Sequence, residues 1–192
     1  MKAYFVAPLF EFVVLFSACA DNRRDTGVEN QQNDIAIPTA VIKQEPLVFK
    51  DSQINTGDVK PVELLSYAIS LLGTSYKYAS IDPKQGLDCS GFITYVFNHF
   101  GIAVPRSSKD FTNVNQEINL RNSKPGDLIL FTGTDSTLRD VGHMGIISIN
   151  DGRNVHFIHS TSGKAYGVTV TPLNKYYQGR YVKTIRVFKS ND

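Results

Sequence analysis

The stretch Gly86-Leu87-Asp88-Cys89-Ser90-Gly91-Phe92 decides the fold, because it places a cysteine where a loop turns into a helix. Asp88 is a favourable N-cap residue, since its carboxylate can accept hydrogen bonds from free backbone N–H groups. Apolar residues then recur at helical spacing as far as Phe100, and Gly101 supplies a stop signal. The sequence therefore predicts a helix over 89–100 with Cys89 in its first turn.

The position of Cys89 favours a reactive thiol. Free N–H groups and the helix dipole stabilise negative charge at a helix start, so we expect them to lower the thiol pKa from about 8.5 towards neutrality. The thiolate is the nucleophilic form of cysteine. The alternative is a small buried residue that packs the helix start, and on Cys89 alone the two interpretations are evenly matched.

The first 18 residues are similar to a secretory signal. Lys2 supplies a positive charge, residues 3–16 are mostly apolar, and Ser17-Ala18-Cys19 offers small residues before a cysteine. The apolar run is too short to span a membrane comfortably. Its end resembles a bacterial lipobox, which implies cleavage before Cys19 and lipidation of that residue. A plain signal peptide or a poor anchor helix is the alternative.

The chain has only two cysteines, and this count bears on Cys89. If Cys19 carries lipid, Cys89 has no intramolecular disulfide partner. A lone thiol in an oxidising exported compartment is a liability unless it has a use. This argument favours the reactive interpretation of Cys89.

Length and composition predict one folded domain with extra segments in 192 residues. The net charge of +2 is small and its basic residues are scattered, which argues against a nucleic-acid partner. Nine Tyr and twelve Phe, with Val and Ile, favour a sheet. We expect a signal peptide over 1–18, a polar tether over 19–59 and the folded domain over 60–192.

The periodicity of the domain predicts helices first and strands second. One helix is expected over 61–72, with Val62, Leu65, Ile69 and Leu72 as its apolar stripe, and a short helix is expected over 105–114. Five strands are expected after the turn at Pro125-Gly126, over 128–131, 143–149, 155–159, 167–171 and 181–188. This order predicts an α+β fold with an antiparallel sheet.

A cysteine nucleophile needs a base, and the chain has four histidines. His99 lies ten positions after Cys89 in the same helix, about 15 Å away, and cannot serve. His143, His156 and His159 fall in one predicted hairpin. His159 shares a face with His143 if the hairpin loop has an odd number of residues, whereas an even loop places His156 there. One Cys with two His could also bind zinc, but the spacing fits no common zinc motif.

Five motifs in this order resemble the NlpC-type cell-wall cysteine peptidases over residues 61–188. They are Leu87-Asp88-Cys89-Ser90-Gly91-Phe92, Pro105-Arg106-Ser107-Ser108, Pro125-Gly126-Asp127-Leu128-Ile129-Leu130-Phe131, Gly142-His143-Met144-Gly145-Ile146 and Phe157-Ile158-His159-Ser160-Thr161. The resemblance implies a papain-like core in which the cysteine helix packs on the antiparallel sheet.

The same resemblance implies roles for single residues. Cys89 would be the nucleophile, His143 the general base and then acid, and His159 the third, orienting residue. His156 is nearer the family's usual separation and stays an alternative to His159. Tyr76 and Ser90 would contact the substrate or the oxyanion. The family usually has two glycines where Ala79-Ser80 stand, so the loop lining the cleft can differ in shape.

The function that the resemblance implies is hydrolysis of peptidoglycan stem peptides, typically between D-γ-glutamate and meso-diaminopimelate, without cofactor or metal. We expect a monomer, exported and lipid-anchored to the bacterial cell envelope, facing the periplasm. Ala20 follows Cys19, which in enterobacteria is compatible with sorting to the outer membrane. The alternatives are a catalytically silent wall-binding lipoprotein and an amidase or acyltransferase on the same Cys-His core.

Overall fold

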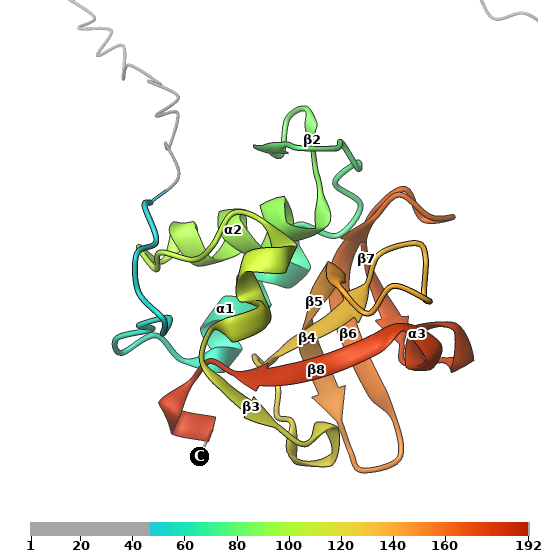
Figure 1. The fold of residues 1–192 in the computed structure, drawn as a ribbon. Helices are drawn as coiled ribbons and strands as arrows, with labels where there is room; N and C mark the ends of the chain where they lie inside the picture. The colour runs from blue at the N-terminus through green and yellow to red at the C-terminus, as the bar shows by residue number, and fades with distance from the viewer. Residues whose placement is uncertain (1–46, 192) are drawn as a thin grey trace, which may run out of the picture. The chain divides into compact units, whose positions relative to one another are not determined.

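A computed structural model describes residues 47–191, which form helices and one six-stranded antiparallel sheet (Figure 1). The strand order is β3-β8-β4-β5-β6-β7, and β1 and β2 form a separate two-stranded ribbon. The elements are α1 (Pro61–Ser70), β1 (Ile81–Asp82), β2 (Gly86–Leu87), α2 (Cys89–His99), η1 (Ser108–Asn113), β3 (Gln116–Ile118), η2 (Leu120–Asn122), β4 (Leu128–Thr132), β5 (Val141–Asn150), β6 (Val155–Thr161), β7 (Gly167–Pro172), α3 (Lys175–Arg180), β8 (Tyr181–Arg186) and η3 (Lys189–Asn191).

The α+β class and the five expected strands are confirmed. The segment 105–114 contains a 3-10 helix, η1, rather than an α-helix. The elements that the periodicity missed are short: β1 and β2 have two residues each, β3, η2 and η3 have three each, and α3 has six. Segments of this length contain too few residues to show a period.

The helix α1 confirms the expected element but buries a different face. Leu64, Leu65 and Ala68 are buried, whereas Val62 and Ile69 of the predicted stripe are 68% and 50% exposed. Two overlapping faces have helical spacing here, and Leu65 belongs to both. Packing against α2 selects the face with two adjacent leucines. The spacing of apolar residues within α1 does not reveal this contact.

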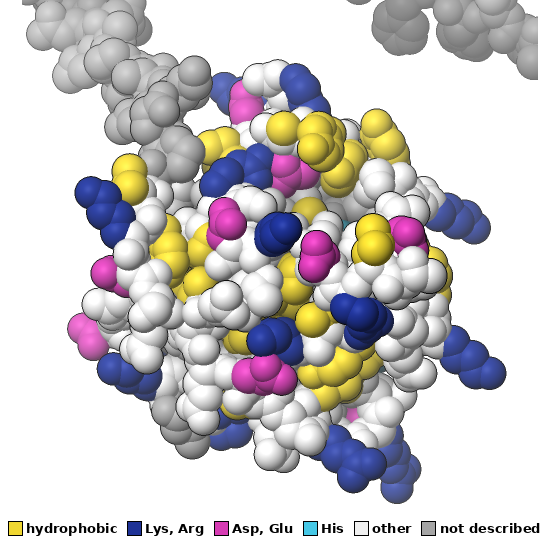
Figure 2. Space-filling view, in the orientation of Figure 1, with side chains coloured by type: hydrophobic (Ala, Val, Ile, Leu, Met, Phe, Trp, Pro, Cys, Tyr) yellow, Lys and Arg dark blue, Asp and Glu magenta, His cyan; other side chains and the backbone are white. Residues whose placement is uncertain are grey.

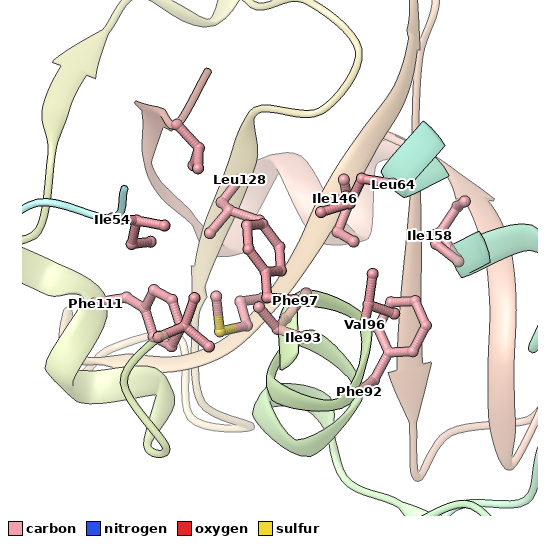
Figure 3. Packing of buried hydrophobic residues seen from close by; sticks show 14 of the residues in the cluster. Ile54, Leu64, Phe92, Ile93, Val96, Phe97, Phe111, Leu128, Ile146 and Ile158 are labelled. Atoms are coloured by element: carbon pink, nitrogen blue, oxygen red, sulfur yellow. The ribbon is translucent and has the colours of Figure 1, made fainter. Parts of the chain in front are cut away.

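The two faces of the sheet carry separate apolar clusters. On one face, α2 packs against β5 and β6, and its side chains point at strand residues such as Leu128, Ile146 and Ile158 (Figure 3). The α2 residues in this contact are Phe92, Ile93, Val96 and Phe97, all fully buried. Burial of each such side chain stabilises the fold by about 1.5–3 kcal/mol. The other face carries a smaller cluster formed by Ile129, Phe131, Ile147, Phe157 and Tyr177 of α3.

The segment before α1 lies on the domain. Ile54 is 5% exposed and belongs to the main core, and Phe49 packs against the same cluster. The side chain of Asn115 accepts a hydrogen bond from the backbone N–H of Ile54 at 2.7 Å. The backbone N–H of Asn115 in turn donates to the carbonyl of Ser52 at 2.9 Å. The last part of the expected tether is therefore fixed to the folded domain.

The surface seen in Figure 2 mixes both signs of charge, with Lys and Arg interspersed among Asp and Glu. Within residues 47–191, no helix is both long and apolar enough to cross a bilayer. The predicted signal peptide and the lipidation site at Cys19 lie outside the described residues.

Candidate active site

The cysteine lies at the first residue of α2, as predicted, and Asp88 is the N-cap residue. The Asp88 carboxylate accepts a hydrogen bond from the backbone N–H of Gly91 at 2.5 Å. Arg106 binds the same carboxylate with both terminal nitrogens, at 2.7 and 3.1 Å, and donates to the Ser90 hydroxyl at 3.0 Å. We call Asp88, Ser90 and Arg106 the cap clasp. It fixes the backbone that carries the thiol.

The acidity of the Cys89 thiol differs from the sequence expectation. Burial, followed by the negative charge of Asp88, raises the pKa of Cys89 to about 11. The backbone N–H groups of Ser90 and Cys89 and the charge of Arg106 act in the opposite direction, as the helix-start argument predicts. They are outweighed, so the expected lowering of the pKa is wrong. The thiol is neutral at physiological pH.

The two histidines of the expected pair are in direct contact. His143 on β5 and His159 on β6 face the same side of the sheet, with His143 Nε2 2.8 Å from His159 Nδ1. Aromatic rings surround them: the Phe157 ring centroid is 4.7 Å from that of His159, and the Tyr177 ring centroid is 5.5 Å from it. His159 is fully buried. The imidazoles therefore belong to the aromatic side of the sheet.

A bulge in β5 decides which histidine meets His143. Asn150 pairs with Val155, so the hairpin loop has four residues, and an even loop alone would place His156 beside His143. The register shifts at Ser148, because Ile147 pairs with Phe157 while Ile149 pairs with His156. The extra residue reverses the parity and brings His159 to the face of His143. The Nδ1 atom of His156 is buried without a hydrogen-bond partner among the described residues.

Both imidazoles are held in their neutral form. Burial is the main cause that lowers the pKa of His159 to about 3, and the charge of Arg180 adds to it. Burial also places the pKa of His143 well below its ordinary value, with further contributions from His159 and Arg180. Arg180 lies in α3 and donates to the Thr132 carbonyl at 2.8 Å. A neutral imidazole can accept a proton, which a general base requires.

Three observations relate the segment around Cys89 to the strands that carry the two histidines. The helix α2 packs against β5 and β6. The Ser160 hydroxyl, next to His159 in β6, donates to the carbonyl of Leu87 at 2.6 Å. Tyr76 forms a β-bridge with Leu87 and is partly buried. Burial is the main cause that raises the Tyr76 pKa, and Cys89 in its thiolate form is the next cause. Tyr76 therefore lies close to the thiol and keeps its hydroxyl proton.

The loop where the family usually has glycines keeps a glycine-like backbone. Ala79 adopts φ +58°, in the left-handed region that glycine favours. The carbonyl of Ser80 accepts a hydrogen bond from the Asp88 backbone at 3.1 Å. A Cβ atom on Gly91 would lie 2.1 Å from that same carbonyl oxygen, so the helix start fits this loop only with glycine at 91.

Sequence reasoning missed the residues that surround the histidines. Thr171 on β7 lies 2.8 Å from His159 Nε2, and Tyr177 and Arg180 come from the short helix α3. The segment Tyr176-Tyr177…Arg180-Tyr181 resembles the closing segment of the family, but the sequence assigns these residues no role, since they reach the site only through strand order and the packing of α3. Within residues 47–191, no group of three His, Cys, Asp or Glu side chains is placed to hold a metal ion.

Comparison with known proteins identifies the class to which this fold and site belong. The model of the NlpC/P60 family matches residues 73–186. The chain is 30% identical over 182 residues to the Escherichia coli protein named murein DD-endopeptidase MepS/murein LD-carboxypeptidase, covering 94% of this chain and 90% of that protein. It is also 34% identical over 142 residues to the gamma-DL-glutamyl hydrolase of Bacillus subtilis, covering 74% of this chain but only 33% of the relative.

Solved structures agree with these matches. An NlpC/P60 family protein from Bacillus cereus superposes with a TM-score of 0.60 and 26% identity, over 72% of this chain and 43% of that one. A lipoprotein-like protein of the same family from Staphylococcus aureus gives a TM-score of 0.58 and 26% identity, over 72% and 45%. The chain belongs to the NlpC/P60 family, and the predicted resemblance is confirmed.

Proposed function

We propose that this chain is a peptidoglycan endopeptidase that hydrolyses stem-peptide amide bonds with Cys89 as nucleophile and His143 as general base. The relatives support this class of substrate, since the Escherichia coli protein is named a murein endopeptidase. The observation that carries the proposal is the contact of His143 Nε2 with His159 Nδ1 at 2.8 Å. It leaves Nδ1 as the ring nitrogen that can take the thiol proton.

The neutral forms of both groups define the chemical steps. The Cys89 proton passes to Nδ1 of His143 while sulfur attacks the carbonyl carbon, and the scissile C–N bond then breaks as the departing amine takes that proton. Water next loses a proton to Nδ1 and attacks the thioester, which releases the carboxylate and the thiol. The Cys89 backbone N–H and the Tyr76 hydroxyl would stabilise the oxyanion.

The scissile bond that we propose lies between D-γ-glutamate and meso-diaminopimelate. The name of the Bacillus subtilis relative, a gamma-DL-glutamyl hydrolase, supports this bond. A D,D cross-link between stem peptides is the second candidate, because the relative matched over 90% of its length is named a DD-endopeptidase. The two bonds give products of different mass.

The test is digestion of purified diaminopimelate-type peptidoglycan by the full-length protein, with products identified by mass. Cys89→Ala and His143→Ala are expected to lower the rate by about 1,000-fold or more, since the members of such a unit act together. His159→Ala should also lower it strongly. The matched control is His156→Ala in the same hairpin, which should keep most of the activity.

The outcomes separate the candidate functions. Loss in Cys89→Ala and His143→Ala with γ-glutamyl products supports the proposal as stated, and cross-link cleavage moves it to the second bond. Cleavage at a bond outside the stem peptide would indicate an amidase on the same Cys-His pair. An intact wall with folded wild-type protein would contradict the endopeptidase and leave a wall-binding lipoprotein.

We also propose that Cys19 carries lipid and anchors the protein to the outer membrane, facing the wall. The support is the lipobox-like sequence before Cys19 and the Ala20 that follows it. Membrane fractionation of wild type and Cys19→Ser tests this. Recovery of both in the same soluble fraction would contradict the anchor.

A further inference from the structure

A hydrogen-bonded chain continues from the two histidines into β7. His143 Nε2 lies 2.8 Å from His159 Nδ1, and His159 Nε2 lies 2.8 Å from the Thr171 hydroxyl. We propose that Thr171 is a positioning residue whose hydroxyl holds His159, and through it His143, in the tautomers that proton transfer requires. The inference deepens the proposed function, because it rests on Cys89 and His143 as the reacting pair.

The tautomers follow from the atoms in contact. When His143 carries the proton of Cys89, both of its ring nitrogens are donors. Its Nε2–H can then be satisfied only if His159 Nδ1 accepts, which places the single proton of His159 on Nε2. That Nε2–H needs an acceptor in turn, and the Thr171 oxygen lies at hydrogen-bonding distance. Thr171 therefore must accept from His159 whenever His143 is charged.

The opposite arrangement blocks the reaction. If Thr171 donates to His159 Nε2, His159 carries its proton on Nδ1 and donates to His143 Nε2. Neutral His143 then carries its proton on Nδ1, the nitrogen that must receive the thiol proton. A threonine hydroxyl permits both arrangements because it can donate and accept, whereas a side chain without a hydroxyl supports neither.

The position of Thr171 is set by the sheet. In the pairing of β6 with β7, His159 lies opposite Thr169 and Phe157 lies opposite Thr171, so His159 and Thr171 are diagonal neighbours on one face. His159 is fully buried, so an unpaired Nε2–H cannot be left to bulk water. The other ionisable groups that act on the two histidines come from α3: Arg180 through its charge, and Tyr177 through ring contact.

The experiment replaces the hydroxyl by a methyl group of similar size. Thr171→Val is expected to lower kcat about tenfold and leave KM within twofold, because the lost acceptor is needed only when His143 is charged. Thr171→Ser should restore most of the rate. Thr169→Val is the matched control, since it lies two residues earlier on the same face and should leave the rate unchanged.

A spectroscopic measurement distinguishes positioning from a general loss of structure. In protein labelled with ¹⁵N-histidine, imidazole spectra at pH 7 should place the proton of wild-type His159 on Nε2. In Thr171→Val a substantial fraction should move to Nδ1, and Thr171→Ser should resemble wild type.

The inference is overturned if wild-type His159 carries its proton on Nδ1, or if Thr171→Val keeps both the wild-type tautomer and the wild-type kcat. The tautomer measurement needs no turnover. A wild-type protein that cleaves no peptidoglycan would therefore contradict the proposed function, while the ¹⁵N spectra of the same sample would still decide the role of Thr171.

Discussion

The cysteine side and the histidine side of the site are built from different interactions. Around Cys89 the backbone is fixed by the cap clasp, a charged set in which Arg106 binds the Asp88 carboxylate with two nitrogens. Around His143 and His159 the neighbours are the rings of Phe131, Phe157 and Tyr177. One side is held by ion pairing at a helix start, and the other by aromatic packing on a sheet.

Both constructions nevertheless favour the neutral form of the groups that they surround. Burial and Asp88 raise the pKa of Cys89 to about 11, while burial and Arg180 lower the pKa of His159 to about 3. With these pKa values the resting protein holds Cys89 as a thiol and His159 as a neutral imidazole. In the mechanism that we propose, the Cys89 proton therefore leaves during the attack on the substrate and not before it.

Substitution of one glycine on each side of the site tests this comparison. These substitutions have the largest expected effect on the free energy of unfolding. A Cβ on Gly91 would lie 2.1 Å from the backbone oxygen of Ser80, whereas a Cβ on Gly145 would lie 2.7 Å from a Phe157 ring carbon and 2.8 Å from the Ile158 carbonyl. We expect Gly91→Ala to lower the free energy of unfolding by roughly 2–3 kcal/mol and Gly145→Ala by less, because the closest backbone oxygen lies at 2.8 Å from the Gly145 Cβ position but at 2.1 Å from that of Gly91.

Urea denaturation of the two variants measures this difference. Gly133→Ala is the control, since nothing lies within 4 Å of its Cβ position and its backbone is not left-handed. If Gly145→Ala proves the more destabilising of the two, the histidine side tolerates an added methyl group less well than the cysteine side, which is the opposite of the expected order.

The sequence predicts the cysteine side better than the histidine side, for a physical reason. The start of α2 is local: Asp88, Cys89 and the apolar period after them lie within a dozen residues, and the N-cap is confirmed. The choice between His159 and His156 depends on the bulge at Ser148, which leaves no mark in the alternation of apolar residues. Thr171 reaches His159 only through the β6–β7 register.

The acidity of Cys89 shows the same limit on the cysteine side. Sequence alone indicates the helix start, which lowers a thiol pKa, but it does not reveal how deeply the thiol is buried. Burial and Asp88 reverse the sign. Local chemistry was therefore predictable, whereas every quantity that depends on neighbours from other elements required the fold.

The second prediction concerns acid and isolates the histidine side. The pKa of His159 is about 3 in the folded protein and 6.5 as a free side chain, so below pH 6.5 the unfolded chain binds a proton that the folded chain does not. Stability from this group is complete above pH 6.5 and falls by about 1.4 kcal/mol per pH unit as the pH decreases towards 3. At pH 5 the loss is about 2 kcal/mol from His159 alone.

Denaturant unfolding at pH 7 and pH 5 checks this dependence. His159→Gln should be less stable than wild type at pH 7, yet its stability should change less between the two pH values. His99→Gln is the control, because His99 is exposed and stacks on Tyr67 away from the site. An equal change in wild type and His159→Gln would show that His159 binds a proton in the folded state.

The smallest expected effect tests the charge on the cysteine side. Asp88→Asn keeps an N-cap side chain of equal quality but removes the negative charge that raises the Cys89 pKa. Iodoacetamide should alkylate Cys89 at pH 8 roughly threefold to tenfold faster in this variant, because the thiolate is the reacting form. Mass spectrometry of the peptide that contains Cys89 measures the rate. Arg106→Met should slow it, since Arg106 lowers the same pKa.

Lys109→Met provides the matched control. Lys109 lies three residues after Arg106, and its ion pair with Asp140, at 3.7 Å, joins two exposed side chains. Its alkylation rate should equal that of wild type. An unchanged rate in Asp88→Asn would mean that burial alone sets the thiol pKa. The cap clasp would then serve only to hold the helix start, and the two sides of the site would differ in architecture but not in how they control protons.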